Sequence, residues 1–400
     1  MSRSLIAAAG AAFLMVCGSS ADAQRAVTRA QAIAAALAHG PALAVAAADT
    51  ATARAALIGA RAYPNPTLTV SATRDYPRGH IFADIPLDFP WLRRPRIASA
   101  GAARASALDQ FALQRAAVTF DAETTYVNAV VANARARLSR RNAQDADSLR
   151  RMAELRRDAG DASDLDVALA AIAAGQQDNA ALGDSLAAVS ALLDLQTVMG
   201  EPSDRVTIAL ADSLSLADTV GAAGRTPYAI GAAREAVTAA EQALAAERRS
   251  VWGSASLQLG ADFGDNSQNG ALPLVGLAIP IPLFNRNGSG VAAAQAQRDR
   301  ARAQLRLIEL ESRRDIARVT EAQAIARQRV ARDRTLLASA DRVARMALTA
   351  YREGASPLAT VLQAQTNARD TFAQYITDVG TANAAAAALR LLTASAPGTP

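Results

Sequence analysis

The chain repeats one plan twice: a short stretch of alternating apolar and polar residues is followed by a helical stretch of about 60 residues. The first helical stretch, Ile97 to about Asp158, contains no proline and has its one glycine near the start. At 1.5 Å per residue it would extend about 90 Å. No compact domain holds a helix of that length, so the repeat predicts coiled-coil-like packing of long helices that carry short strands.

Glycine and serine interrupt each long helical stretch before a second helix returns. The breaks are Gly160–Ser163 and Gly354–Pro357, and the returning helices are expected at Asp164–Met199 and Leu358–Thr393. Alanine-rich helices are expected before each alternating stretch, at Thr28–Arg61 with a break at Gly40-Pro41, and at Pro227–Arg249. The predicted organisation is a signal peptide at 1–23, two repeats at 24–226 and 227–394, and a disordered tail at 395–400. The first repeat contains a β-hairpin at about 66–90, a helical hairpin at about 97–199 and a linker at 203–226. The second contains a β-hairpin at about 252–284 and a helical hairpin at about 291–393.

Composition agrees with thin helical packing. Hydrophobic residues make up 51% of the chain but aromatic residues only 4%. The apolar share is mostly alanine, a strong helix former that suits close helix contacts better than a thick core. Basic residues number 42 and acidic residues 37, and the two are interleaved. This pattern favours solvated helix faces over nucleic-acid binding, and it leaves anionic lipid headgroups as an alternative minor partner.

The N-terminus has the pattern of an export signal. Arg3 supplies the positive region, Leu5–Val16 the apolar region, and Ala21-Asp22-Ala23 a small-x-small cleavage site. Cys17 offers a rival interpretation as a lipid-attachment cysteine, although no small residue precedes it. After the signal, no uninterrupted apolar run approaches the roughly 20 residues of a membrane-spanning helix. Any segment that spans a membrane is therefore expected to be a strand.

The alternating stretches predict amphipathic strands. Leu68 and Val70 share one face of the first stretch, and Thr67, Thr69 and Ser71 share the other. Strands of about ten residues with this alternation match tilted membrane strands. A sheet in lipid must close, and four strands cannot, so three copies with twelve strands are a natural solution. The alternative is a small soluble sheet on a periplasmic coiled-coil scaffold.

These motifs, in this order and twice, resemble the TolC outer-membrane efflux family over essentially all of the mature sequence. The IPIPLFNRN run is most similar to the outer-membrane subunits of heavy-metal or cation efflux systems. The residues that carry the resemblance are Pro64-Asn65-Pro66, Pro86–Phe89, Pro280–Asn287 and the two reversals 159–166 and 351–358.

The resemblance implies a mainly α fold with a small β part. As a trimer it would form a 12-stranded outer-membrane β-barrel that continues into a periplasmic α-helical barrel. It also implies a periplasmic adaptor and an inner-membrane pump, expected to be of the RND class. The two reversals would be the adaptor contact at the periplasmic tip, through Gly160, Asp161, Ser163, Asp164, Leu165, Tyr351, Gly354, Ser356, Pro357 and Leu358. Turn and capping chemistry is the alternative role of the same residues.

At the tip, the family narrows its pore with aspartates one turn past the second reversal. The matching positions here are Thr360 and Gln363, so that acidic ring is absent from the helix. Asp164 and Asp166, with Asp161, could supply the negative charge instead, although acidic residues at a helix start also simply complement the helix dipole. Trp91 and Trp252 flank the hairpins as membrane-interface aromatics do, and packing against neighbouring helices is the alternative.

No pattern in the sequence indicates an enzyme. His39 and His80 are the only histidines and lie far apart, so neither a metal site nor a Ser-His-Asp arrangement is predicted, and no cofactor is expected. The predicted function is a passive trimeric outer-membrane duct that exports small solutes, metal cations or drugs. A type I protein-secretion outlet and the periplasmic scaffold are the alternatives.

Overall fold

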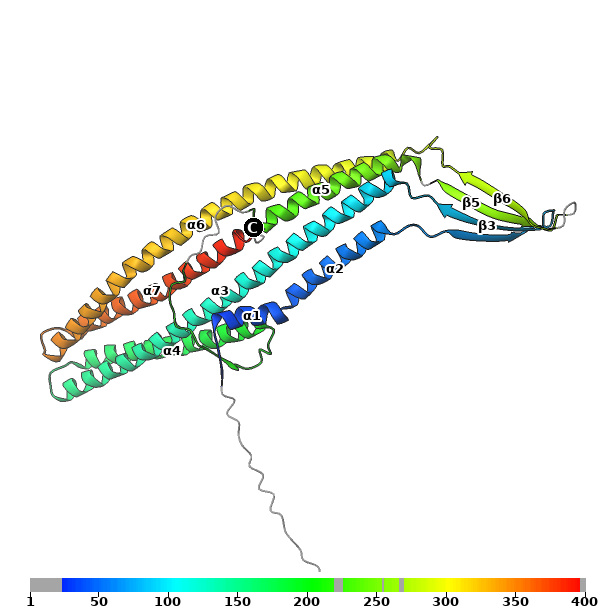
Figure 1. Ribbon diagram of the computed structural model, residues 1–400. Helices are drawn as coiled ribbons and strands as arrows, with labels where there is room; N and C mark the ends of the chain where they lie inside the picture. The colour runs from blue at the N-terminus through cyan, green and yellow to red at the C-terminus, as the bar shows by residue number, and fades with distance from the viewer. Residues whose placement is uncertain (1–23, 219–225, 254, 266–269, 396–400) are drawn as a thin grey trace, which may run out of the picture.

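The computed structural model describes residues 24–218, 226–253, 255–265 and 270–395. The chain forms an elongated layer of helices with a small β-sheet at one end (Figure 1). This confirms the mainly α fold with a small β part. The predicted signal peptide and residues 396–400 of the predicted tail lie outside the described residues. Ser395, which was assigned to the tail, instead forms an antiparallel bridge with Pro227.

Two very long helices run the length of the layer. They are α3 (Pro90–Asp158, 69 residues) and α6 (Gly288–Arg352, 65 residues), each about 100 Å long at 1.5 Å per residue. The shorter helices are α1 (Arg29–His39), α2 (Pro41–Arg61), α4 (Asp164–Met199), α5 (Tyr228–Arg249) and α7 (Leu358–Leu392).

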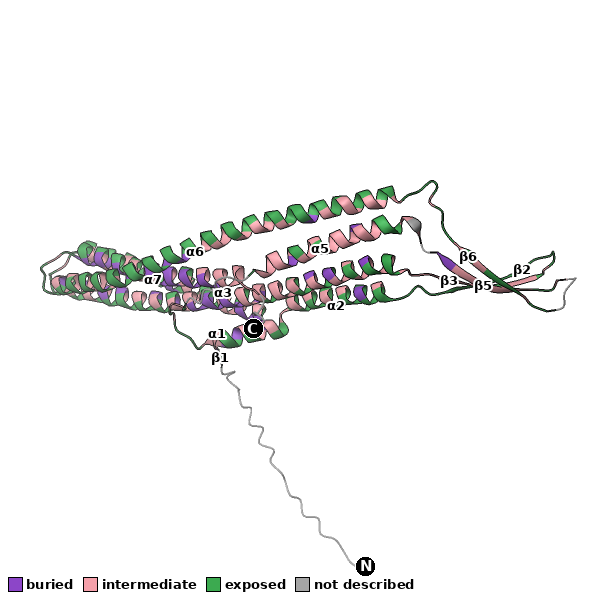
Figure 2. Ribbon diagram, turned by 45° about the horizontal axis from the view of Figure 1, so that its top comes forward, coloured by how far each residue is buried: buried purple, intermediate pink, exposed green. Residues whose placement is uncertain are grey.

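The helices lie side by side in one layer. Toward the sheet their order is α6, α5, α3, α2, and toward the opposite end it is α6, α7, α3, α4 (Figure 1). A single layer has no second layer to bury its faces, so alanine accounts for many of the buried apolar residues (Figure 2). The two edges of the layer are α6 on one side and α2 with α4 on the other.

The first long helix begins at Pro90, seven residues before the predicted start at Ile97, and therefore contains Pro95. Pro90 fits the first turn, where an N–H would have no partner. Pro95 cannot donate to the Trp91 carbonyl four residues earlier. Arg249 at the end of α5 donates to that carbonyl instead, at 3.2 Å. This tertiary hydrogen bond explains how the helix continues through a proline.

The strands form one antiparallel sheet in the order β2 (Thr67–Ala72), β3 (Gly79–Pro86), β5 (Ser256–Phe263) and β6 (Leu272–Ala278). The two repeats meet where β3 pairs with β5. The last strand ends at Ala278, whereas the sequence predicted that it returns as far as Phe284. Pro280 and Pro282 have no N–H to donate to a ladder, which explains the early end.

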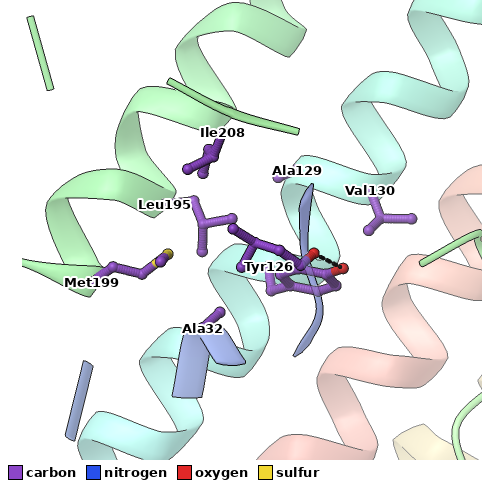
Figure 3. Packing of buried hydrophobic residues seen from close by; sticks show 8 residues of the cluster. Ala32, Tyr126, Ala129, Val130, Leu195, Met199 and Ile208 are labelled. Atoms are coloured by element: carbon purple, nitrogen blue, oxygen red, sulfur yellow. Dashed lines mark hydrogen bonds between the residues drawn. The ribbon is translucent and has the colours of Figure 1, made fainter. Parts of the chain in front are cut away.

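A second small sheet lies at the middle of the molecule, inside the segment 203–226 that was predicted to be a linker. There β4 (Ile208–Leu210) pairs in parallel with β1 (Arg25–Val27). The pair covers a core cluster of Val27, Ala32, Tyr126, Ala129, Val130, Leu195, Met199 and Ile208 (Figure 3). The Tyr126 hydroxyl donates to the Val27 carbonyl at 3.0 Å and also lies 2.9 Å from Asp212 Oδ2. The linker is therefore tied into the core.

Among the described residues, one helix has the length and hydropathy of a candidate membrane span. This is α2, which has 21 residues and an 18-residue stretch with a mean hydropathy of 1.3. Asp49 and Arg54 interrupt it, so α2 is not the uninterrupted apolar run that the sequence analysis looked for. Its hydropathy comes largely from alanine, and it lies along α3 within the helical layer.

Candidate functional site

The four-stranded sheet has one apolar face, as the alternation predicted. Val70 of β2 lies opposite Ile81 of β3, which lies opposite Ala261 of β5. Leu259 of β5 in turn lies opposite Val275 of β6. Because cross-strand partners point to the same side, these residues form a continuous apolar face. It is not covered in the protomer, where Val70 is 68% exposed and Val275 74% exposed.

The opposite face of the sheet has polar side chains on β2, β3 and β5, and the apolar Leu272 and Leu274 on β6. His80 Nδ1 of β3 lies 2.8 Å from Asp262 Oδ1 of β5, and Asp84 lies opposite Gln258. Gly260 lies opposite Phe82, and a Cβ atom there would come within 2.6 Å of the Phe82 Cβ. Glycine at position 260 therefore makes room for the Phe82 side chain, and Leu274 of β6 lies opposite it on the other side.

The sheet is open on both sides. Within the described residues, β2 pairs only with β3, and β6 pairs only with β5. Each outer strand therefore presents a row of backbone N–H and C=O groups without a strand partner. Such edges pair readily with another chain, and in lipid they are not tolerated.

Polar contacts anchor the sheet to the helices. Asp88, after β3, lies 2.7 Å from a guanidinium nitrogen of Arg96, and its side chain is only 3% exposed. In the second repeat, Asn287 donates to the Glu247 carboxylate at 2.7 Å. Trp91 lies at this level, at the start of α3, where it stacks on Phe89 at 4.4 Å and is 52% exposed.

Trp252 ends a short 3-10 helix, η1 (Ser250–Trp252), which leads into β5. The two tryptophans therefore flank the helix–sheet junction in both repeats. Their role at a membrane interface stays a prediction.

At the other end of the molecule, the two helical reversals have the same backbone geometry. Gly160 (φ 86°) and Gly354 (φ 77°) both adopt the left-handed conformation. Asp161 N–H donates to the Arg156 carbonyl at 2.8 Å, and Ala355 N–H donates to the Ala350 carbonyl at 2.8 Å. This is the Schellman arrangement that glycine favours after a helix. The sequence repeat is thus a structural repeat as well.

The next helix begins differently at the two reversals. Ser163 caps α4, because its Oγ accepts from Asp166 N–H at 3.1 Å while Asp166 Oδ2 accepts from Ser163 N–H at 3.2 Å. At the second reversal, Pro357 precedes α7 without a side-chain cap, and Ser356 Oγ is buried without a hydrogen-bond partner. The position after the left-handed glycine that caps the next helix is therefore Ser163 at the first reversal and Pro357 at the second.

Arg156 joins the two reversals. Its guanidinium lies over the Tyr351 ring, 4.7 Å from the centroid, and donates to the Tyr351 carbonyl. It also lies 3.4 Å from the Asp161 carbonyl. The sequence analysis did not single out Arg156, because nothing in its local pattern distinguishes it from the other arginines of this chain.

The structure separates the predicted tip residues into exposed and buried groups. Leu165, at the start of α4, is 66% exposed, while Leu358, at the start of α7, is 1% exposed. Tyr351 is buried as well, and with Leu358 it belongs to a core cluster that includes Leu149 and Val361. The expectation that Tyr351 and Leu358 are contact residues is therefore wrong in this protomer, since both fill the space between α3, α6 and α7. The exposed members are Gly160, Asp161, Ser163, Asp164, Leu165, Gly354 and Pro357.

The predicted pore-lining residues also divide. Thr360 and Gln363 are exposed on one face of α7, where the Gln363 amide donates to Asn367 Oδ1 at 3.0 Å. Asp164 is exposed at the start of α4. Asp166 instead takes part in the helix cap with Ser163, which agrees with the alternative that it complements the helix start.

Two groups of buried charges lie along the helices. The Glu123 carboxylate, with 5% of its side chain exposed, pairs with both Arg29 and Arg390. Asp333 of α6 and Asp378 of α7 are buried together. Burial is the main cause that raises the pKa of Asp333, and the neighbouring Asp378 raises it further. Within the described ranges, no group of three or more His, Cys, Asp or Glu side chains is placed to hold a metal ion.

No protein-family model matches the sequence, and no curated protein sequence matches it. The structure is nevertheless similar to solved channel proteins over 92% of the chain. The outer membrane protein VceC from Vibrio cholerae aligns with a TM-score of 0.80 at 19% identity over 96% of its own chain. CusC aligns with a TM-score of 0.79 at 17% identity over 92% of its own chain. The CmeC outer membrane channel of Campylobacter jejuni aligns with a TM-score of 0.79 at 14% identity over 85% of its own chain. These likenesses confirm the fold that the TolC resemblance implied.

Proposed function

We propose that the chain is the subunit of a passive, trimeric outer-membrane efflux channel. Three copies would join their four-stranded sheets into a twelve-stranded barrel in the outer membrane, and their helical layers would form a tube into the periplasm. The conduit would export small solutes, namely metal cations or drugs. These would come from an inner-membrane pump, for which we propose the RND class, and would pass through a periplasmic adaptor. The chain itself would carry out no chemistry.

The observation that carries this proposal is the open sheet with an exposed apolar face. Val70, Val275 and Leu277 are more than half exposed on that face, and β2 and β6 have free edges. In lipid, both the apolar face and the backbone groups of the edges are satisfied once identical sheets pair edge to edge. The similarity of the fold to outer-membrane channels supports the same assembly.

The reversal loops are the proposed adaptor contact. Gly160, Asp161, Ser163, Asp164, Leu165, Gly354 and Pro357 are exposed at the end of the molecule opposite the sheet (Figure 1). Leu165 supplies an apolar anchor there, and Asp161 and Asp164 supply polar contacts beside it. Thr360 and Gln363 are proposed to face the pore at the same end, with Asp164 as the acidic candidate.

Cell fractionation followed by detergent extraction and mass determination tests the proposal. We expect an outer-membrane species with about three times the mass of one protomer. A soluble periplasmic monomer or dimer would contradict the channel and would favour the alternative of a coiled-coil scaffold with an ordinary soluble sheet.

A further inference from the structure

A groove of about 490 Å³ runs along the helical layer toward the end that carries the reversals. Its lining comes from α3, α6 and α7, and α7 lies between the other two helices (Figure 1). On α3 the lining includes Leu138, Asn142, Asp145, Leu149 and Met152. These residues are three or four positions apart, so they share one face of that helix. All three helices belong to one copy, so the groove forms without a neighbouring copy.

The groove carries an excess of positive charge. Four arginines and two aspartates line it, which is an excess of two positive charges. Arg345 pairs with Asp341. The other three arginines have no carboxylate oxygen within 4.0 Å among the described residues, and they are Arg141, Arg352 and Arg369. The groove therefore offers cationic groups whose charge the protomer does not neutralise.

Arg369 of α7 is the arginine that an anion would stabilise most. Its side chain is half-buried, and burial lowers its pKa, while Asp145 and Asp370 act in the opposite direction. Its Nη2 donates to Gln365 Oε1 at 3.0 Å. In the described part of the chain this is the one hydrogen bond of its guanidinium, which has five N–H donors. A partly desolvated cation with unused donors is stabilised by an anion that accepts from them.

The part of the groove nearer the reversals is apolar. Leu149 and Met152 of α3 and Leu348 of α6 line it, and Leu149 is only 2% exposed. At 1.5 Å per residue from the reversal ends of their helices, they lie at heights of about 14, 9 and 6 Å. Arg369 lies at about 17 Å and Arg141 at about 26 Å. An apolar surface about 8 Å long therefore adjoins the cationic groups, and pockets of this size bind molecules with an apolar body and a polar anchor.

We infer that this groove binds an organic monoanion with a flat apolar body. Its anionic head accepts hydrogen bonds from Arg369 and Arg141, and its body lies along Leu149, Met152 and Leu348. An inorganic anion would leave the apolar part of the groove uncovered, and a neutral molecule would leave the Arg369 charge without a counterion. The inference goes beyond the proposed channel function and does not depend on the trimer, because a single copy supplies the whole site.

Calorimetric titration of the purified protein in a nonionic detergent tests the site, after the heats of titration into detergent alone are subtracted. The probe is naphthalene-2-sulfonate, and naphthalene-2-sulfonamide is a neutral counterpart of nearly the same shape. We expect a dissociation constant on the order of 100 µM for the sulfonate. The sulfonamide and inorganic sulfate should each bind about tenfold more weakly. Equal affinity for sulfonate and sulfonamide would overturn the anionic site, and equal affinity for sulfonate and sulfate would overturn its apolar part.

Substitutions in the full-length chain locate the site. Arg369→Gln removes the half-buried charge and should weaken sulfonate binding about tenfold. Arg342→Gln is the matched control, because it makes the same change at an exposed arginine of α6 that does not line the groove. It should bind the sulfonate as the unaltered protein does. If Arg369→Gln lowers the melting temperature, Arg141→Gln at an exposed position gives the same readout, with binding weakened about threefold.

An unchanged dissociation constant in both Arg369→Gln and Arg141→Gln would overturn the inference. A similar loss of binding in Arg342→Gln would also overturn it, because the probe would then be responding to the general positive charge of the helices. The oligomer mass is measured on the same samples. A trimer that does not bind the sulfonate would sink the groove site and leave the channel standing, whereas a monomer that binds it would support the site and count against the channel.

Discussion

The guanidinium of Arg156 lies 4.7 Å from the centroid of the Tyr351 ring, and it also donates a hydrogen bond to the Tyr351 carbonyl. These residues are 195 positions apart and belong to different repeats. Arg156 lies one turn before the first reversal, and Tyr351 lies just before the second. Their contact therefore connects the tips of the two helical hairpins, in addition to the core cluster that Tyr351 and Leu358 form with Leu149.

Replacing Arg156 with glutamine should loosen both reversals together. The change removes a cation–π contact, worth about 1 kcal/mol, and a charge-assisted hydrogen bond to the Tyr351 carbonyl. Hydrogen exchange at residues 155–166 and 350–358 should accelerate, while exchange at the sheet stays unchanged. Arg157→Gln is the control, because the Arg157 side chain forms its ion pair with the neighbouring Asp158. Faster exchange at the first reversal alone would show that the contact does not couple the two hairpins.

Gly354→Ala should destabilise the protein by about 1–2 kcal/mol, because the residue has a φ of 77° that alanine adopts only with strain. Gly175→Ala offers a matched control with the same chemical change. Gly175 lies inside α4, and a Cβ atom there would meet nothing within 4 Å. That variant should gain about 0.5–1 kcal/mol from helix propensity. Denaturant unfolding measures both, and equal shifts would contradict the backbone argument.

Asp333→Asn should stabilise the helical hairpin at neutral pH by about 1 kcal/mol. The introduced amide can donate a hydrogen bond to Asp378, whereas the Asp333 carboxyl group can do so only when it is protonated. In the native protein, burial and Asp378 raise the pKa of Asp333, against the lowering effect of Arg332 and Arg329. Between the ordinary and the raised pKa the folded state binds more protons than the unfolded state. The free energy of unfolding should therefore fall as pH rises through this window.

Unfolding curves across that pH range, with and without the substitution, check the sign. The slope should become smaller in Asp333→Asn. An unchanged slope would mean that Asp333 titrates in the folded protein as it does in the unfolded chain.

Tyr126→Phe should cost about 1–2 kcal/mol at neutral pH, because it removes the hydrogen bonds of the hydroxyl to Val27 and Asp212. Burial and Asp212 raise the pKa of Tyr126 to about 12. Its native state keeps the proton where the unfolded state has lost it, so stability should fall as pH rises above about 10. Chemical denaturation at pH 8 and pH 11 tests this: the penalty of the substitution should be smaller at pH 11.

The two faces of the sheet give a prediction for the proposed barrel. Val70→Arg places a charge on the apolar face and should cost about 2–4 kcal/mol in lipid, while Ser71→Arg, next in the strand but on the polar face, should be tolerated. The amount of heat-resistant oligomer in outer-membrane fractions distinguishes them. Equal losses for both variants would indicate that the apolar face does not meet lipid.

Much of the fold could be predicted from local pattern. Prolines, glycines and helical period defined α4 at Asp164–Met199, and alternation separated Val70 from Ser71. The reversal glycines were found for the same reason, because a left-handed residue after a helix is a local requirement. Helix starts were harder, since Pro95 was tolerated only through a hydrogen bond from Arg249 that no local pattern reveals.

The sequence by itself determined the repeat, the lengths of the helices and the two faces of the strands, because these depend on neighbours within a few residues. Only the tertiary structure decided that Leu165 is exposed while Leu358 is buried, although both follow the same reversal motif. It also decided that Arg156 contacts Tyr351, and that α6 forms one edge of the layer while α2 and α4 form the other. Such outcomes depend on which helices, distant in sequence, pack against one another, and the local residue pattern does not indicate that packing.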